Sequence, residues 1–292
     1  MIMENKERIE EDKHAIDDLF HRSLNFKNSE EYLRFFGFIG KIIHYSHYNA
    51  MLVYMQKNDV NYFGTPGYWK KTFNRTVNVG ARPYVIIVPF GPATLAYDVR
   101  ETTGVLSPEK FIEKGFNGEL FQIRGYLPEE LLKEIKNTLA EYKIFVHEEI
   151  MPFNKGGETY DYSKGQIQID ISKSFTPEQA FASLIHELAH NFLGHLGEKV
   201  LTKESVYVSG KNKGKPKIET ITIAARDVNF DMREIEAETV SYVICSRWNL
   251  ESDPKRYISS HITEENIKNI SPETIIRVAD EIENYFLKRF KL

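Results

Sequence analysis

The stretch TPEQAFASLIHELAHNF, residues 176–192, decides the fold of the second half of the chain. Thr176 precedes a proline and stands three residues before Gln179, which is the pattern of a helix that starts with proline and a capping box. The stretch therefore predicts a helix that begins directly after Thr176. Because an α-helix turns about 100° per residue, His186 and His190 lie on one face of this helix, one turn apart.

The motif HELAH, residues 186–190, has the residue types of a zinc-dependent hydrolase site. A zinc ion accepts two imidazoles that are spaced in this way as ligands. Glu187 follows the first histidine and can act as general base toward a water whose pKa zinc lowers to roughly 7. We therefore expect His186 and His190 to bind zinc and Glu187 to be catalytic. The competing interpretation is a pair of histidines without a metal.

A catalytic zinc takes three protein ligands, so the motif needs one more. His195 lies five residues after His190, whereas the metzincin pattern needs six, and we expect His195 to have a structural role. The better source is the segment REIEAETVSYVIC, residues 233–245, within a helix expected over 231–248.

Glu234 and Glu238 of this segment are four residues apart and share a helix face, while Glu236 points elsewhere. We expect Glu238 to bind the metal and Glu234 to orient a histidine through a hydrogen bond, or the two roles to be exchanged. Small Ala237 and Ser241 let this helix pack close to the motif helix. The competing interpretation is a solvated acidic stripe, because glutamates are common near helix starts.

The rest of the second half predicts further elements and a loop. The strand over 166–170 alternates between apolar and polar residues, which predicts a half-buried strand, and its edge can bind an extended peptide. Residues 199–217 hold six lysines among glycines and serines, which predicts a mobile loop beside the cleft. Cys245 is expected to be a buried packing residue. Helices are expected over 128–142 and from Ser271 to the end, and a strand over 143–147.

The first half predicts a separate set of elements. An amphipathic helix is expected over 4–24. A second helix over 29–56 is expected to begin at Ser29 and to break near Gly37 or Gly40. Two strands over 76–79 and 84–88 are expected around a turn at residues 80–83, followed by a linker-like stretch over 95–125.

Composition limits the class of protein. The chain has 292 residues, of which 41% are hydrophobic and 27% charged, as in a soluble protein of two domains. No apolar run approaches the roughly 18 residues of a membrane span, and the charged first residues lack the apolar stretch of a secretory signal. A single cysteine allows no internal disulfide, so we expect a cytoplasmic location.

Charge is unevenly distributed along the chain. Residues 19–100 hold 10 Lys and Arg against 4 Asp and Glu, a balance of +6, and residues 126–292 hold 22 against 27, a balance of −5. Aromatic residues lie among the basic ones in the first half, which is typical of single-strand nucleic-acid binding, where bases stack on rings. The competing interpretation is that these aromatics form the core. The expected nucleic-acid contacts are Trp69, Lys70, Lys71 and Arg75.

Several motifs together resemble a known family. HELAHNFLGH and EAETVSYVIC, residues 186–195 and 236–245, resemble the ImmA/IrrE family of zinc metallopeptidases and the zincin-like domain of ArdC-type antirestriction proteins. YSHYN, GYWK and VGAR, which begin at residues 45, 67 and 79, resemble the ArdC amino-terminal domain, described as binding single-stranded DNA. The matches leave residues 100–165 thinly supported.

The resemblance implies an α+β protein of two domains. A small α+β domain over 1–125 would bind single-stranded DNA, and a zincin-like metallopeptidase domain over 126–292 would hold the HExxH helix and an edge strand. The two motif histidines match zinc ligands and Glu187 the catalytic glutamate. The third ligand stays open, because Glu238 with Tyr242 fits the family pattern and Glu236 with the small residue after it fits in part.

Three functions are compatible with these patterns. The first is a zinc metallopeptidase coupled to a DNA-binding domain, which cleaves a protein or peptide in antirestriction, mobile-element or stress regulation and has no membrane partner. The alternative is a non-catalytic DNA-binding antirestriction protein with a vestigial or structural zinc site. The third is a regulatory peptidase whose first half recognises a protein. Glu187 favours an enzyme, because a structural zinc needs no base.

Overall fold

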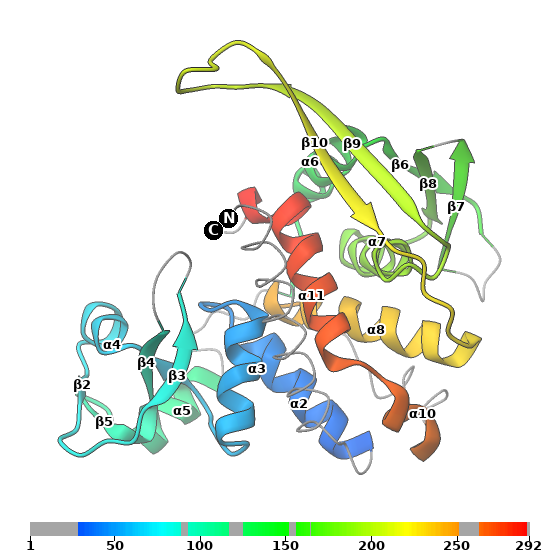
Figure 1. The fold of residues 1–292 in the computed structure, drawn as a ribbon. Coiled ribbons are helices and arrows are strands. Elements are labelled where there is room, and N and C mark those ends of the chain that lie inside the picture. Colours follow the sequence, from blue (N-terminus) through cyan, green and yellow to red (C-terminus); the bar gives the residue numbers. More distant parts are fainter. Residues whose placement is uncertain are drawn as a thin grey trace, which may run out of the picture. The chain divides into compact units, whose positions relative to one another are not determined.

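The computed structural model shows a mixed α+β fold with small sheets (Figure 1). Its elements fall into two compact units, which meet in the sequence between Arg124 and Gly125. Among the described residues, no helix combines the length and the apolar character needed to cross a membrane. The described residues are 29–88, 93–116, 125–151, 156–163, 165–250 and 263–290, so the helix expected over 4–24 lies outside them.

The first unit opens with two helices, α2 (Ser29–Lys41) and α3 (His47–Gln56). The chain breaks between them, beyond the glycines at which the sequence predicts a break. The reason is local: the Ser46 side chain accepts a hydrogen bond from the backbone amide of Asn49 and so starts a new helix. Glycine costs a helix only about 1 kcal/mol relative to alanine, and α2 continues through both glycines.

The strands of the first unit form two small antiparallel sheets. The expected pairing of 76–79 with 84–88 is wrong, because these segments lie in different sheets. One sheet has the order β1 (Phe63–Gly64), β4 (Ala93–Asp98), β3 (Tyr84–Ile87), and the other pairs β2 (Thr76–Val77) with β5 (Thr102–Thr103).

Side chains from α3 occupy the second edge of β3. Asn49 donates to Ile87 O at 2.8 Å and accepts from Ile87 N at 2.9 Å. Gln56 does the same for Val85, at 2.9 Å and 2.8 Å. The two amide groups thus take the place of a neighbouring strand, which explains why β2 pairs elsewhere.

Residues 95–125, expected to be linker-like, hold regular structure in their described part. The guanidinium of Arg75 orders this stretch, donating to Thr102 Oγ1 at 2.7 Å, Thr102 O at 3.0 Å and Leu106 O at 2.7 Å. These contacts join segments far apart in the sequence, so local composition does not reveal them. After β4 the chain forms a 3₁₀ turn, η1 (Val99–Glu101), then β5 and then α5 (Pro108–Phe116).

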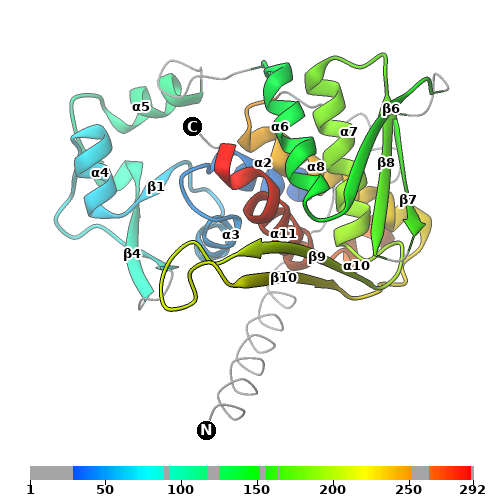
Figure 2. The ribbon, with the colours of Figure 1, turned by 90° about the horizontal axis from the view of Figure 1, so that it is seen from above.

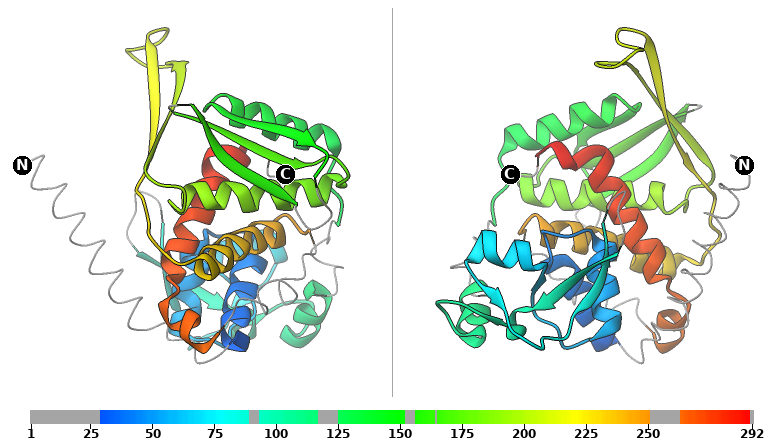
Figure 3. Two further views of the ribbon diagram at one scale, coloured as in Figure 1. Left: turned by 90° about the vertical axis from the view of Figure 1, so that its right-hand side faces the viewer. Right: turned by 60° about the vertical axis from the view of Figure 1, so that its left-hand side comes forward.

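The second unit is layered around a three-stranded sheet. Its order is β6-β8-β7, with β6 parallel and β7 antiparallel to β8, and Figure 2 shows β8 in the middle. Helix α6 covers one face, α7 covers the other, and α8 packs on the far side of α7 (Figure 3). The bounds are α6 (Glu129–Ala140), β6 (Ile144–Glu149), β7 (Gly157–Ser163), β8 (Gln166–Ser172), α7 (Pro177–Phe192) and α8 (Phe230–Arg247).

The central place of β8 corrects two expectations. Its alternating sequence predicts a half-buried strand, but the strand is buried on both faces because α6 and α7 cover it. Its polar side chains bond one another: Gln168 donates to Asp170 at 2.8 Å, and Tyr160 of β7 donates to the same carboxylate at 2.9 Å. The edge strands are β6 and β7, and β7 is the one that packs on α7, so β7 takes the place expected for the edge of 166–170.

A long β-hairpin replaces the mobile loop expected over 199–217. Strands β9 (Lys199–Val206) and β10 (Pro216–Ile223) pair along their whole length. The many lysines obscure a run of β-branched residues, which favours strands. Tyr142, beyond the end of α6, donates to Glu219 at 2.9 Å and anchors the ribbon, whose far end extends away from its own unit (Figure 1).

The final helix begins where the sequence predicts it. The Ser271 side chain accepts from the backbone amide of Thr274 at 3.3 Å and caps α11, which packs on α7 and α8. This contact supports the two site-bearing helices from one side. The bounds are α10 (Glu264–Asn269), α11 (Pro272–Ile282), the π-helical turn η2 (Glu283–Leu287) and the 3₁₀ turn η3 (Lys288–Phe290).

Candidate metal centre

Helix α7 places the HELAH motif. The Thr176 side chain accepts from the backbone amide of Gln179, and the Gln179 side chain accepts from the backbone amide of Thr176, so the expected capping box is confirmed. The chain leaves α7 through Gly194, whose φ is +75°. A Cβ on Gly194 would lie 2.0 Å from Ala224 O, so this close crossing requires glycine.

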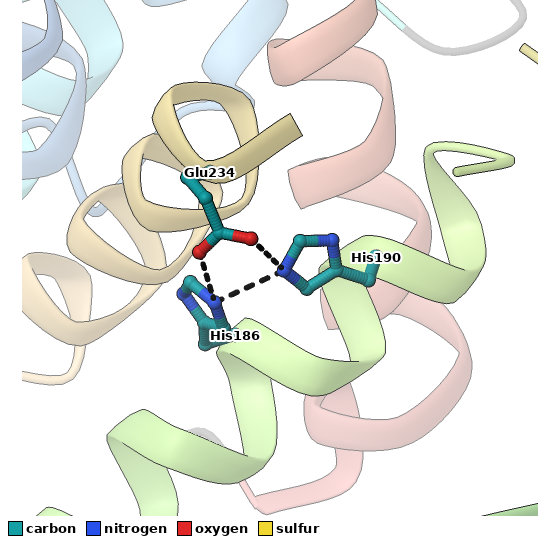
Figure 4. Close-up of side chains that lie close together, drawn as sticks. All are labelled: His186, His190 and Glu234. Carbon is teal, nitrogen blue, oxygen red and sulfur yellow. Dashed lines mark hydrogen bonds and ion pairs between the residues drawn. The ribbon is translucent and has the colours of Figure 1, made fainter. Parts of the chain in front are cut away.

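Three side chains from α7 and α8 converge on one point (Figure 4). His186 Nε2 and His190 Nε2 are 3.1 Å apart. The two carboxylate oxygens of Glu234 lie 3.5 Å from these nitrogens, one from each. All three side chains are partly buried.

The two glutamates of the third-ligand segment take different places. Glu234 faces the Nε2 atoms, while Glu238 Oε2 lies 3.2 Å from His186 Nδ1, on the other side of that ring. Of the two arrangements that the sequence allows, this geometry matches the exchanged one, with Glu234 on the Nε2 side. The sequence shows only that the two glutamates are four residues apart on one helix face, which does not distinguish their roles. The way α8 crosses α7 decides which carboxylate faces the Nε2 atoms.

His195 joins the site from the loop after α7. Its Nδ1 lies 3.0 Å from His190 Nδ1, and its Nε2 lies 3.1 Å from Glu236 Oε2. Arg226 donates to both oxygens of that carboxylate, at 2.8 Å and 2.9 Å. The sequence offers Glu236 only as a partial candidate for the third ligand, and in the structure its carboxylate contacts His195 and Arg226 instead of the motif histidines. The sequence pattern does not reveal Arg226 as a site residue.

The electrostatic environment gives the two motif histidines opposite pKa shifts. Burial lowers the pKa of His186, and hydrogen bonds with Glu234 and Glu238 raise it by more, to about 10. Burial and the adjacent His186 lower the pKa of His190 to about 3. Without a metal, the site therefore holds one proton on His186 between two carboxylates, and His190 is neutral.

Glu187 lies where the motif helix meets the edge strand. Its side chain is buried against Gly157 of β7, so close that a Cβ on Gly157 would lie 2.9 Å from Glu187 Oε1. The same Cβ would lie 2.7 Å from Ser183 Oγ. Further along, Asn191 donates to Thr159 Oγ1 of β7 at 2.7 Å. The edge strand is thus held directly beside the expected catalytic base.

Small residues on α8 let it pack closely on α7, as the sequence predicts. Ala237 is fully buried, and Ser241 donates to Ala182 O at 3.0 Å. Cys245 is also fully buried, which confirms it as a packing residue. Burial raises the pKa of its thiol to about 12, so it stays protonated near neutral pH.

The expected nucleic-acid contacts divide into two groups. Trp69 is fully buried and donates to Tyr97 O at 3.0 Å. Arg75 is also buried, and its guanidinium donates to Thr102 and Leu106 within the protein. Neither side chain can meet a nucleic acid in this conformation, because both lie in the core of α4 (Pro66–Phe73) and its neighbours. Lys70 and Lys71, in the last turn of the same helix, are exposed.

Comparison with known proteins adds no relative. No protein-family model, no curated protein and no solved structure matches the chain.

Proposed function

We propose that this chain is a zinc-dependent metallopeptidase with the ligand set His186, His190 and Glu234. The observation that carries the proposal is the convergence of two imidazole nitrogens and one carboxylate. In a tetrahedral site with ligands roughly 2.0–2.1 Å from zinc, neighbouring donor atoms lie about 3.4 Å apart. The separations of 3.1 Å and 3.5 Å in this site fit that value.

The chemistry of the donor set also fits a catalytic zinc. Two histidines and a glutamate are a known set for such sites, which leave one position free for water or substrate. When bound, zinc supplies a Lewis acid that polarises the scissile carbonyl and makes a water more acidic. Glu238 holds His186 in place from the opposite side of the ring, at 3.2 Å.

Glu187 is proposed to move the protons of the reaction. Its carboxylate takes a proton from the water whose oxygen attacks the peptide carbonyl carbon. It then delivers that proton to the nitrogen of the leaving amine as the carbon–nitrogen bond breaks. Because β7 pairs only with β8 among the described strands, its other edge offers backbone groups to an extended peptide beside Glu187.

The resemblance to ImmA/IrrE and ArdC-type proteins extends this proposal. By that resemblance the second unit is a zincin-like domain, and the first unit binds single-stranded DNA and directs the peptidase to a protein substrate in the cytoplasm. Exposed Lys70 and Lys71 support DNA binding, whereas the burial of Trp69 reduces the case for base stacking.

The test of the peptidase is Glu187→Gln. We expect this variant to bind one zinc per chain like the wild type and to lose a factor of roughly 10²–10⁴ in rate, the usual contribution of a general base. New peptide termini in a proteome-derived peptide library, detected by mass spectrometry, measure cleavage. Glu204→Gln, an exposed glutamate on β9, is the matched control.

Three results of this experiment contradict the proposal. If the wild type takes up no zinc, the proposed metal site is wrong. If the zinc-loaded wild type makes no new termini, or if Glu187→Gln cleaves as the wild type does, the proposed peptidase activity is wrong. If the zinc-loaded wild type makes no new termini but still binds DNA, the non-catalytic DNA-binding alternative replaces the enzyme.

DNA binding is tested by titration of a single-stranded oligonucleotide at several salt concentrations. Each cationic contact to a single strand contributes roughly 0.7 to the slope of log K against log salt. We therefore expect Lys70→Ala with Lys71→Ala to weaken binding and to reduce the slope by roughly 1.4. Exposed Lys133 and Lys268 of the second unit, changed to alanine, are the control. Salt-independent or absent binding of the wild type contradicts the proposal.

A further inference from the structure

His190 has an unusual partner on the ring nitrogen that faces away from the proposed metal. A histidine that binds a metal normally donates its other N–H to a carboxylate, a backbone carbonyl or a water. His186 follows this rule through Glu238. His190 Nδ1 instead lies 3.0 Å from Nδ1 of His195. Two ring nitrogens at this distance form a hydrogen bond only when one carries hydrogen and the other has a free lone pair.

The surroundings of His195 determine which nitrogen carries the hydrogen. Its Nε2 lies 3.1 Å from Glu236 Oε2, and both side chains have no exposed surface. An ionised carboxylate only accepts hydrogen bonds, so His195 Nε2 is the donor. When Nε2 carries the single ring hydrogen of His195, the lone pair is on Nδ1, and His190 Nδ1–H donates to it. The lone pair of His190 is therefore on Nε2, directed at Glu234 and His186.

Arg226 completes this chain of contacts. It donates to both oxygens of Glu236, so the charge of the carboxylate is balanced where it is buried. Paired in this way, Glu236 keeps its oxygens in a fixed plane and holds the imidazole of His195 in one orientation. The histidine rings at positions 190 and 195 are 5.2 Å apart between centroids and strongly inclined, at 63°.

We propose that His195, held by Glu236 and Arg226, is a positioning residue that fixes the Nδ1–H tautomer of His190 and so keeps its Nε2 free for the metal. The proposal rests on the zinc site proposed above. It gives α8 three functional carboxylates: Glu234 at the metal, Glu238 behind His186, and Glu236 behind His190 through His195. His195 lies one residue too early to be the third ligand of a metzincin, and the proposal gives it a role behind His190 instead.

The test compares two substitutions of His195. His195→Leu removes the acceptor, and we expect it to weaken zinc binding by roughly 10–100-fold, as loss of such a partner does. His195→Asn places an amide oxygen near the position of Nδ1, and we expect it to keep an affinity close to that of the wild type. The dissociation constant of zinc is measured by competition with a chelator. His147→Leu, a partly exposed histidine on β6, is the control.

A second measurement separates positioning from simple packing. Nitrogen-15 spectra of the imidazoles in the metal-free wild type report the tautomers, which we expect to be Nε2–H for His195 and Nδ1–H for His190. The opposite tautomer of His195 overturns the proposal. So does a His195→Leu variant that binds zinc as the wild type does, or an asparagine variant that binds as weakly as the leucine variant.

These outcomes stay separate from the fate of the zinc site. A wild type that binds no zinc contradicts the proposed function, and the tautomers of the metal-free protein still decide the role of His195. If His195→Leu does not fold, as judged by its unfolding midpoint, the asparagine variant and the wild-type spectra decide it.

Discussion

Glu234, Glu236 and Glu238 occupy alternate positions of α8, yet each carboxylate reaches a different atom. Glu234 faces both Nε2 nitrogens, Glu238 contacts Nδ1 of His186, and Glu236 contacts His195. Chemically identical side chains thus differ in role because the packing of α8 on α7 sets where each one points. Residue type predicts that a glutamate takes part, and only position in space tells which.

Substitution of the two exchangeable glutamates tests this assignment. We expect Glu234→Ala to weaken zinc binding by more than about 100-fold, because a direct ligand is lost. Glu238→Ala is expected to weaken it by roughly 10–100-fold, because only a partner of His186 is lost. Chelator competition measures both, with Glu204→Ala as control. A larger loss for Glu238→Ala would return the ligand role to Glu238.

The raised pKa of His186 predicts a pH dependence of zinc binding. In the folded, metal-free protein this imidazole keeps its proton up to a pKa of about 10, whereas His190 is already neutral above pH 3 or so. Zinc needs the neutral form of His186, so binding releases one proton below pH 10.

The dissociation constant of zinc is therefore expected to fall about tenfold for each unit of pH between 6.5 and 8.5. Calorimetry in buffers of different ionisation enthalpy counts the released proton. An affinity that does not change above pH 7.5 would show instead that His186 titrates near the ordinary value of about 6.5.

At the scale of elements, β7 and α7 are held together beside Glu187. The contact of Gly157 with Glu187 and the hydrogen bond from Asn191 to Thr159 hold the edge strand along the motif helix. Glycine at position 157 lets the backbone of β7 pass directly over the carboxylate of Glu187. The strand therefore positions the proposed base as well as the edge for a substrate.

Gly157→Ala tests the role of this contact. The added methyl group would overlap Glu187 and Ser183, and we expect the carboxylate of Glu187 to move away. A shift of about 1 Å can cost roughly 10²-fold in rate, so kcat is expected to fall while zinc affinity stays at the wild-type value. Gly125→Ala, where a methyl group meets nothing within 4 Å, is the control. Unchanged kcat would mean that Glu187 does not depend on β7.

At the scale of the whole molecule, two compact units are joined in one chain. The proposed zinc site lies entirely within the second unit, where it links α7 to α8. The chain has two tryptophans, Trp69 in the first unit and Trp248 in the second, so each unit has its own fluorescent reporter.

Zinc is expected to stabilise the second unit alone. A free zinc concentration about 1,000 times the dissociation constant adds roughly 4 kcal/mol to the free energy of unfolding of the unit that binds it. Trp248, observed in Trp69→Phe, should therefore report a higher unfolding midpoint with zinc, and Trp69, observed in Trp248→Phe, should not. Equal shifts of both reporters would show that the two units unfold together.

Local signals in the sequence predict the helices and the motif well. The capping box of Thr176 and Gln179 and the cap at Ser271 depend on residues three positions apart, so the sequence contains the whole interaction. The partners of β2 and β3, and the hairpin over 199–223, depend on contacts that composition does not encode. The burial of Trp69 and Arg75 likewise depends on Tyr97 and Thr102, distant in the chain.

The sequence by itself determines the motif helix, its two facing histidines, the adjacent glutamate and a helix with carboxylates to meet them. The helical period and the capping residues are enough for this, because they act over a single turn. Only the tertiary structure decides that Glu234 faces the Nε2 atoms, that β7 is the edge strand beside α7, and that His195 links His190 to Glu236. Those outcomes depend on how α8 crosses α7 and on which strand is central, and such packing is set by the whole core rather than by any one segment.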